Sequence, residues 1–157
     1  MALTDAYLAQ TKNLSAILAA LRGAQAPEKL TVRFLEQLGF KSTNDRNIIG
    51  VLKGLGFLDD SGAPKQRYFE YLDETQHKAI MGQAVQEAYA DLFKVNNKAC
   101  EMSQADVRAK LKTLTQGSKG DSVLSKMAMT FVAHAKRRRS HHWLHLRNLQ
   151  RNKSGIR

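Results

Sequence analysis

The sequence is poor in cysteine and proline, and its single cysteine excludes one class of protein. Cys100 has no second cysteine to pair with, so a secreted scaffold held by internal disulfides is excluded. No window approaches the roughly 20 consecutive apolar residues that a membrane-spanning helix needs. The N-terminal residues do not combine a basic segment with a long apolar one, so we expect no secretory signal and a cytoplasmic location.

Motifs of catalysis are also missing. Neither G-x-x-x-x-G-K-[ST] nor a G-x-G-x-x-G after a strand occurs, which argues against a nucleotide-dependent enzyme. His141 and His145 have helical i, i+4 spacing, but no acid or cysteine lies nearby to complete a zinc site. We therefore expect a non-enzymatic protein with no catalytic residues, no cofactor and no metal. The one acidic cluster is predicted on a turn and a helix, where its carboxylates do not converge: Asp59, Asp60, Glu70, Asp73 and Glu74.

The composition is that of a soluble, mostly helical protein. A chain of 157 residues can bury one real core, and 43% hydrophobic with 25% charged residues is ordinary for a globular domain. Apolar residues recur at helical spacing in several long stretches, which predicts an α-rich fold. Helices are expected at 13–21, 30–38, 43–55, 70–93 (with a break near Asp73), 103–114 and 121–135.

The segment from Thr31 to Tyr68 has the order of a winged helix-turn-helix. Gly39 is predicted to end its first helix, and the S-x-x-D spacing of Ser42 and Asp45 predicts a capping box at the start of its second. Turn-forming residues at 59–62, between a short strand at 56–58 and a return segment at 64–68, then predict a small β-hairpin, the wing.

The remaining helices are expected to form a C-terminal helical hairpin, and a divergent second helix-turn-helix is the alternative. The predicted organisation is a winged-helix-like half at 1–74, a helical half packed on it at 75–135, and a basic tail at 136–157.

The second helix of this unit has one apolar and one polar side. Arg46, Asn47 and Lys53 lie opposite its apolar residues, and in a winged helix that side enters the major groove. Arg46 is predicted to bind guanine, Asn47 adenine and Lys53 phosphate. Lys65 and Arg67, on the predicted wing, would contact the flanking backbone.

A second interpretation uses the same helix for protein contact. Two basic residues are few for a DNA-reading helix, and Gly50 and Gly54 on its polar side would let another backbone approach closely. The alternative function is therefore a protein-interaction or oligomerisation module, with a homodimer or a protein partner in place of nucleic acid.

The positive charge is concentrated at the C-terminal end. Of 25 lysines and arginines, eight lie from Lys136 to Arg157, where there is no acid. The other 135 residues hold 17 basic and 14 acidic residues, so the net charge of +11 falls to +3 without the tail. Arg137, Arg138 and Arg139 are predicted to bind phosphate. An anionic membrane, an acidic protein, or a solvated extension of the last helix are the alternatives.

Three segments carry a resemblance to a known family: RFLEQLGFKSTNDRNIIGVLKGLGFLDDSGAPKQRY, EAYADLF and TQGSKGDSVLSKMAMTFVA. Together they resemble a bacterial domain family of unknown function, over Tyr7 to Ala135. The resemblance implies a compact helical domain with a winged-helix half, but no catalytic residue and no ligand, and the tail departs from the family pattern. The kind of family also suggests an adaptor in a mobile-element or defence system. We expect a DNA-binding protein, although the arginines would serve RNA equally.

Overall fold

The computed structural model describes residues 3–138, and these residues form an all-helical domain. The predicted mostly helical class is confirmed. Eight α-helices, with no strand among the described residues, are joined by short turns. Their bounds are α1 Leu14–Gly23, α2 Val32–Gln37, α3 Asn47–Gly54, α4 Gln66–Tyr71, α5 His77–Ala88, α6 Ala90–Val95, α7 Gln104–Leu114 and α8 Asp121–Arg138, with 3-10 turns η1 Thr43–Arg46 and η2 Ala99–Glu101.

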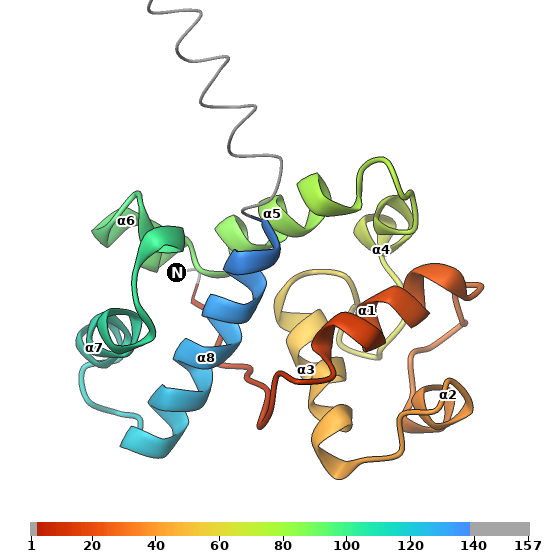
Figure 1. The fold of residues 1–157 in the computed structure, drawn as a ribbon, viewed down its shortest axis with the longest axis horizontal. Coiled ribbons are helices and arrows are strands. Elements are labelled where there is room, and N and C mark those ends of the chain that lie inside the picture. The colour runs from red at the N-terminus through yellow and green to blue at the C-terminus, as the bar shows by residue number, and fades with distance from the viewer. Residues whose placement is uncertain (1–2, 139–157) are drawn as a thin grey trace, which may run out of the picture.

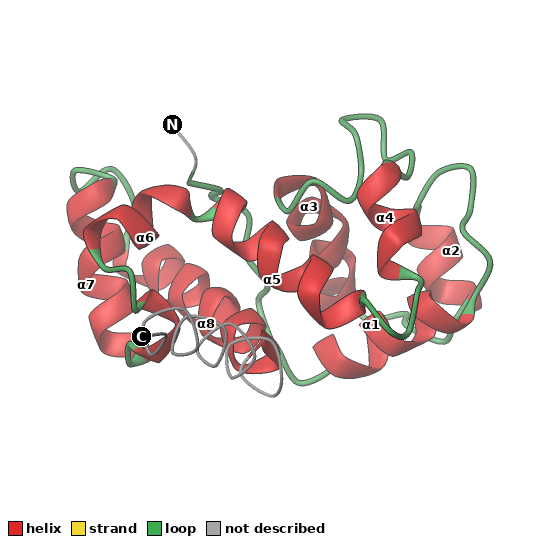
Figure 2. Cartoon of the chain, turned by 90° about the horizontal axis from the view of Figure 1, so that it is seen from above, coloured by secondary structure: helices red, strands yellow, loops and turns green. Residues whose placement is uncertain are grey.

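The helix α8 lies in the middle of the molecule. In Figures 1 and 2, α1–α4 lie on one side of it and α6 and α7 on the other, while α5 runs across the top of Figure 1. Buried residues from both sides belong to one continuous hydrophobic core. Phe131 of α8 packs edge-on against Tyr89, with ring centroids 4.9 Å apart, and against Phe93 at 6.0 Å. The two sides therefore share a core.

Helical periodicity explains the core on the α1 side. Leu14, Ile17, Leu18 and Leu21 of α1 are buried at i, i+3, i+4 and i+7 spacing. The buried face of α3 has the same pattern, with Ile48, Val51 and Leu52.

The start of α2 is set by a local cap. The Thr31 Oγ1 accepts a hydrogen bond from Phe34 N at 3.2 Å. Gly39, with φ of 99°, adopts the left-handed conformation that follows the end of the helix.

The predicted capping box before α3 differs in its partners. The Ser42 Oγ accepts from Asn44 N at 3.2 Å, because the first turn is a 3-10 helix rather than an α-helix. The Asp45 carboxylate is buried and accepts a hydrogen bond from Asn13 Nδ2 at 3.2 Å. It therefore joins α3 to the residue before α1, a role that its sequence neighbours do not reveal.

The predicted β-hairpin wing is wrong. Within residues 3–138 the segment forms one isolated antiparallel bridge, between Leu58 and Pro64, and no strand. Pro64 has no N–H to extend the pairing, and Gln66 already begins α4. The predicted return strand at 64–68 is thus mostly helix.

The turn itself is held against the body. The Asp59 carboxylate accepts hydrogen bonds from Ser61 N at 2.9 Å and Ala63 N at 3.0 Å. Together with the bond from the Ser61 hydroxyl, the strongest cause, these lower the pKa of Asp59. The Gly62 carbonyl accepts from Leu30 N at 2.9 Å, so the end of the turn is tied to the segment before α2, while Asp60 and Ser61 at its tip are exposed.

The predicted long helix at 70–93 is divided into three. The expected break near Asp73 is present, because the Asp73 carboxylate turns the chain by accepting from Thr75 N at 2.8 Å and its hydroxyl at 2.6 Å. A second, unpredicted break occurs at Tyr89, whose φ of −114° and ψ of 33° separate α5 from α6.

The helices α7 and α8 cross steeply. Figure 1 shows α7 nearly end-on while α8 runs across the view. Ser103 caps α7 through a bond of 3.2 Å from Asp106 N, as its S-x-x-D spacing predicts. Helix α8 cannot serve as the exposed second helix of another helix-turn-helix, because Leu124, Ala128 and Phe131 are fully buried in the core.

Residues 3–12, which we call the N-terminal strap, connect the two sides. The Thr4 N–H donates to Ala88 O at 2.9 Å, at the end of α5. The Leu8 N–H donates to the buried Thr130 Oγ1 of α8 at 2.8 Å, and that hydroxyl donates to Lys126 O at 2.8 Å. The strap therefore depends on one side-chain acceptor in the core.

Thr130→Val is expected to destabilise the protein by about 1–3 kcal/mol, because it leaves the buried Leu8 N–H without an acceptor. Thr113→Val is the matched control, since the exposed Thr113 hydroxyl donates to Ala109 O of its own helix and to no other group among the described residues. Urea unfolding of both variants checks this, and an equal loss of unfolding free energy in the two variants would contradict it.

Candidate nucleic-acid interface

The outer side of α3 is the candidate interface. Since Ile48, Val51 and Leu52 are buried, the opposite positions of the helix point to solvent. Gly50 and Lys53 are exposed there. Arg46, at the junction of η1 and α3, is also exposed, and Asn47 is half-buried. The structure thus places Asn47 and Lys53 on α3 and Arg46 directly before it, at the end of η1.

Arg46 has an acidic neighbour that the sequence argument overlooked. Its Nη2 lies 3.8 Å from Glu36 Oε1, and the two side chains are 51% and 43% exposed. An exposed pair at this distance contributes little stability, so the guanidinium can exchange Glu36 for another anion. Glu36 also places one negative charge beside any phosphate that approaches this end of α3.

The two glycines of α3 have different surroundings. A Cβ at Gly50 would meet no atom within 4 Å, so this position is open. A Cβ at Gly54 would overlap Thr4 Oγ1 and lie 3.2 Å from Thr4 Cβ. Gly54 is therefore a contact with the strap of the same chain, and Gly50 alone leaves room for an outside partner.

Arg67 lies in α4 and not on a wing. Its Nη1 donates to Leu55 O at 2.7 Å, satisfying a carbonyl at the C-terminal end of α3, and its Nη2 pairs with Glu87 of α5. Its side chain is only 21% exposed. The guanidinium is thus part of the packing that holds α3, whereas Lys65, just before α4, remains exposed.

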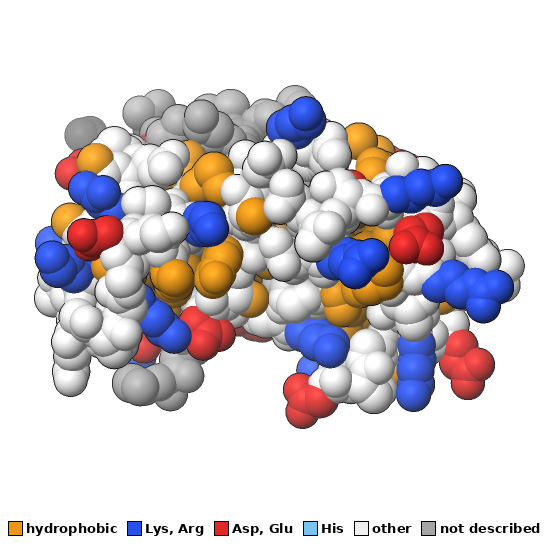
Figure 3. All heavy atoms as spheres, turned by 90° about the horizontal axis from the view of Figure 1, so that it is seen from below, with side chains coloured by type: hydrophobic (Ala, Val, Ile, Leu, Met, Phe, Trp, Pro, Cys, Tyr) orange, Lys and Arg blue, Asp and Glu red, His pale blue; other side chains and the backbone are white. Residues whose placement is uncertain are grey.

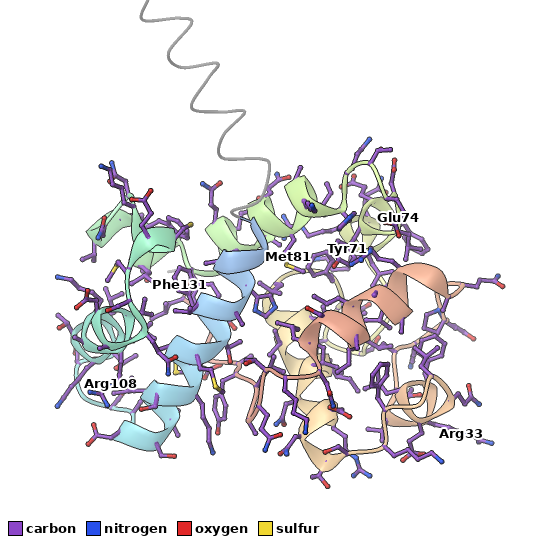
Figure 4. All side chains as sticks on the ribbon, viewed as in Figure 1. Arg33, Tyr71, Glu74, Met81, Arg108 and Phe131 are labelled. Atoms are coloured by element: carbon purple, nitrogen blue, oxygen red, sulfur yellow. The ribbon has the colours of Figure 1, made fainter. Side chains whose placement is uncertain are left out.

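Sequence reasoning missed two exposed cations of the same unit. Arg33 is exposed on α2, and Lys41 is exposed in the turn between α2 and η1. Figure 4 shows Arg33 at the outer edge of α2. No ion pair within residues 3–138 involves Arg33, Lys41 or Lys53. The helical spacing of Arg33 relative to the buried Leu35 was the signal that could have identified it.

The predicted tail contacts fall at the edge of the structure. Arg137 and Arg138 are the last residues of α8, and their side chains lie outside the described part of the chain. Arg139 and the rest of the tail also lie outside the described residues.

A polar cluster joins α1 to α4 and α5. The Arg22 Nη1 donates to Tyr71 Oη at 3.0 Å, and its guanidinium carbon lies 5.6 Å from the centre of that ring. The same arginine pairs with Glu74 through its Nε at 3.5 Å, and Glu74 lies 3.7 Å from His77 Nε2. Figure 4 labels Tyr71 and Glu74 on this side of the molecule. Burial, with a smaller effect of Tyr71, raises the pKa of the adjacent Tyr68 to about 12. We interpret the cluster as structural.

The chain belongs to a family of unknown function (DUF5343), whose model matches residues 6–137. This agrees with the resemblance expected over Tyr7 to Ala135. No curated protein and no solved structure matches the chain. Within the described residues, no helix is both long and apolar enough to span a membrane. No group of three or more metal-binding side chains is present there either.

Gly50→Ala is expected to raise the free energy of unfolding by roughly 1 kcal/mol, because alanine favours a helix and the added methyl has free space. Gly54→Ala is expected to lower it, because Thr4 must move. Thermal unfolding of the pair tests this. A higher free energy of unfolding for both variants would show that the strap does not pack against α3.

Proposed function

We propose that this member of the family is a non-enzymatic protein that binds duplex DNA through the outer side of α3. The observation that carries the proposal is the set of exposed cations on one helix-turn-helix unit, around a position that no other part of the described chain covers. Arg46 and Lys53 flank the open Gly50, and Arg33 and Lys41 extend the charge onto α2 and the connecting turn.

The order and packing of the helices support this proposal. Helix α3 follows α2 through a short turn, buries one face in the core and exposes the other, as a recognition helix does. A short turn at 57–65, tied to the segment before α2, stands where the sequence predicted a wing, so the proposal rests on the helices and not on a wing. Of the predicted wing contacts, only Lys65 remains available, since Arg67 holds α3.

The chemistry of the side chains assigns their roles. Arg46 would break its ion pair with Glu36 and donate two hydrogen bonds to guanine, and Asn47 would pair with adenine. Lys53, Lys41 and Arg33 would contact phosphates and fix the register of the helix. Duplex DNA is favoured over duplex RNA because the deep, narrow major groove of A-form RNA does not admit side chains.

The basic tail would add affinity without sequence preference. Arg137 and Arg138 end the core helix α8 and Arg139 is the next residue in the sequence, so the three are tethered to a folded body. Clustered arginines at one site attract phosphate and release its counterions.

Protein interaction is the second candidate, and Gly50 is the observation that favours it. Its open surroundings suit the approach of another backbone as well as of DNA. Because Gly54 is occupied by the strap, the contact surface is smaller than the two glycines together suggest. In this case the protein would form a homodimer or act as an adaptor in a mobile-element or defence system.

Arg46→Gln with Lys53→Gln is expected to weaken binding to duplex DNA and to reduce the slope of log K against log salt by about 0.9, because Lys53 loses a phosphate contact while Arg46 loses a base contact. Fluorescence anisotropy with a labelled random-sequence duplex over a salt series measures this. Lys94→Gln with Lys98→Gln, on exposed residues in and just after α6, removes the same charge elsewhere and is expected to have little effect.

Equal effects of the two double variants would contradict a role for α3. Light scattering then tests the second candidate. A stable dimer that Gly50→Arg separates, in a protein that does not bind DNA once the tail is neutralised, would establish a protein-interaction module instead.

Replacing Lys136, Arg137, Arg138 and Arg139 by glutamine is expected to lower the salt slope by up to about 3.6 while leaving residual binding by the body. The same anisotropy titration measures it. Complete loss of binding would show that the tail is the only nucleic-acid contact.

A further inference from the structure

The helix α7 is unusually solvated. Only Val107 and Leu111 are fully buried, and almost every other position of the helix is exposed. It lies at one end of the molecule, on the opposite side of α8 from α3 (Figure 1). A helix that buries so little of itself leaves most of its surface available to a partner.

One side of α7 carries a basic stripe, which we define as Ala105, Arg108, Ala109 and Lys112. Residues three and four apart share a side of a helix, and all four are exposed. Lys110 is two residues from both cations and so lies on the other side, four residues after Asp106. The side chains of the two alanines are short, so a flat surface can approach the helix closely.

The cations of the stripe have no counter-ion within residues 3–138. Two other lysines of this half do have partners, since Lys119 lies 3.5 Å from Asp5, and Lys126 lies 6.0 Å from the ring centre of Tyr7. No ion pair among the described residues involves Arg108 or Lys112. Like charges at i, i+4 repel each other, so an anion between them would be stabilising.

We infer that this basic stripe contacts phosphates of the same duplex that α3 engages, outside the segment that α3 reads. The inference rests on the proposed function. Figure 4 places Arg33 and Arg108 at opposite ends of the molecule, both toward its lower side. Figure 3, seen from below, shows lysine and arginine side chains at both ends of this face, with acidic ones among them. Two separated contacts would fix the orientation of the domain along the duplex.

The composition of the stripe favours nucleic acid over the other anionic partners. Protein interfaces depend on aromatic or large apolar anchors, and the stripe has only alanines beside its charges. Binding at a membrane surface likewise needs apolar side chains that enter the lipid. Phosphates need charge and donors alone, and the Arg108 guanidinium can donate two parallel hydrogen bonds to one phosphate.

The test is anisotropy of the full chain with a labelled random-sequence duplex across a salt series. Arg108→Gln with Lys112→Gln is expected to lower the salt slope by about 1.8 and the affinity on the order of tenfold at physiological salt. Lys112→Gln alone is expected to lower the slope by about 0.9, whereas Lys110→Gln, which removes the same charge from the other side of α7, leaves it unchanged.

Equal effects of Lys112→Gln and Lys110→Gln, or no effect of either, would overturn the inference. If polyglutamate of matched charge displaces the duplex as well as unlabelled DNA does, the stripe is a general anion surface and the inference fails. If the stripe variants lose binding but the variant at Arg46 and Lys53 does not, α7 binds DNA while the proposed role of α3 fails. If the variant at Arg46 and Lys53 loses binding but the stripe variants do not, the inference about α7 fails and the proposed role of α3 stands.

Discussion

The central burial of α8 is the constraint on which the rest of the structure depends. This helix packs between two groups of helices, so its buried residues cover a broad face, with Ala128 toward one edge and Thr130 toward the other. A polar residue on that surface needs a partner, and Thr130 obtains one by accepting the Leu8 N–H. Together with the bond from Thr4 N–H to Ala88 O, this bond holds the strap across the core. The position of the strap then restricts residue 54 of α3, because a side chain there would require Thr4 to move.

The placement of α3 results from contacts that lie far apart in sequence. The strap packs at its C-terminal end, Arg67 satisfies the carbonyl of Leu55, and the Asp45 carboxylate joins its first turn to Asn13. Each contact joins α3 to a different element. A helix held in this way can present side chains with little conformational freedom, which is the condition for reading a groove. The outer side keeps its cations because these attachments lie at the two ends of α3.

The helices could be predicted from sequence because their causes are local. Periodic apolar residues located α1, α3, α7 and α8, and the cap at Ser103 is as its spacing predicts. The wing could not be predicted correctly, since the turn chemistry of a hairpin is the same whether the turn projects as a wing or is tied at its end to Leu30. The role of Arg67 was missed for the same reason, because its partner Glu87 is twenty residues away. The tertiary structure decides which cations are paired with acids of the same chain and which are not.

Whether a cation is paired with an acid of the same chain matters more for function than the net charge does. Without the tail the charge is only +3, which by itself gives no reason to expect a polyanion partner. The structure separates its cations into two groups. Arg22, Arg67 and Lys119 are held by acids of the same chain, whereas Arg33, Lys53, Arg108 and Lys112 belong to no ion pair among the described residues. A nearly neutral body can therefore present local positive surfaces, because Asp5, Glu74 and Glu87 each pair with a cation that lies outside those surfaces. The affinity of such a body for DNA would depend on where its cations lie, and the tail would then add strength without choosing the surface.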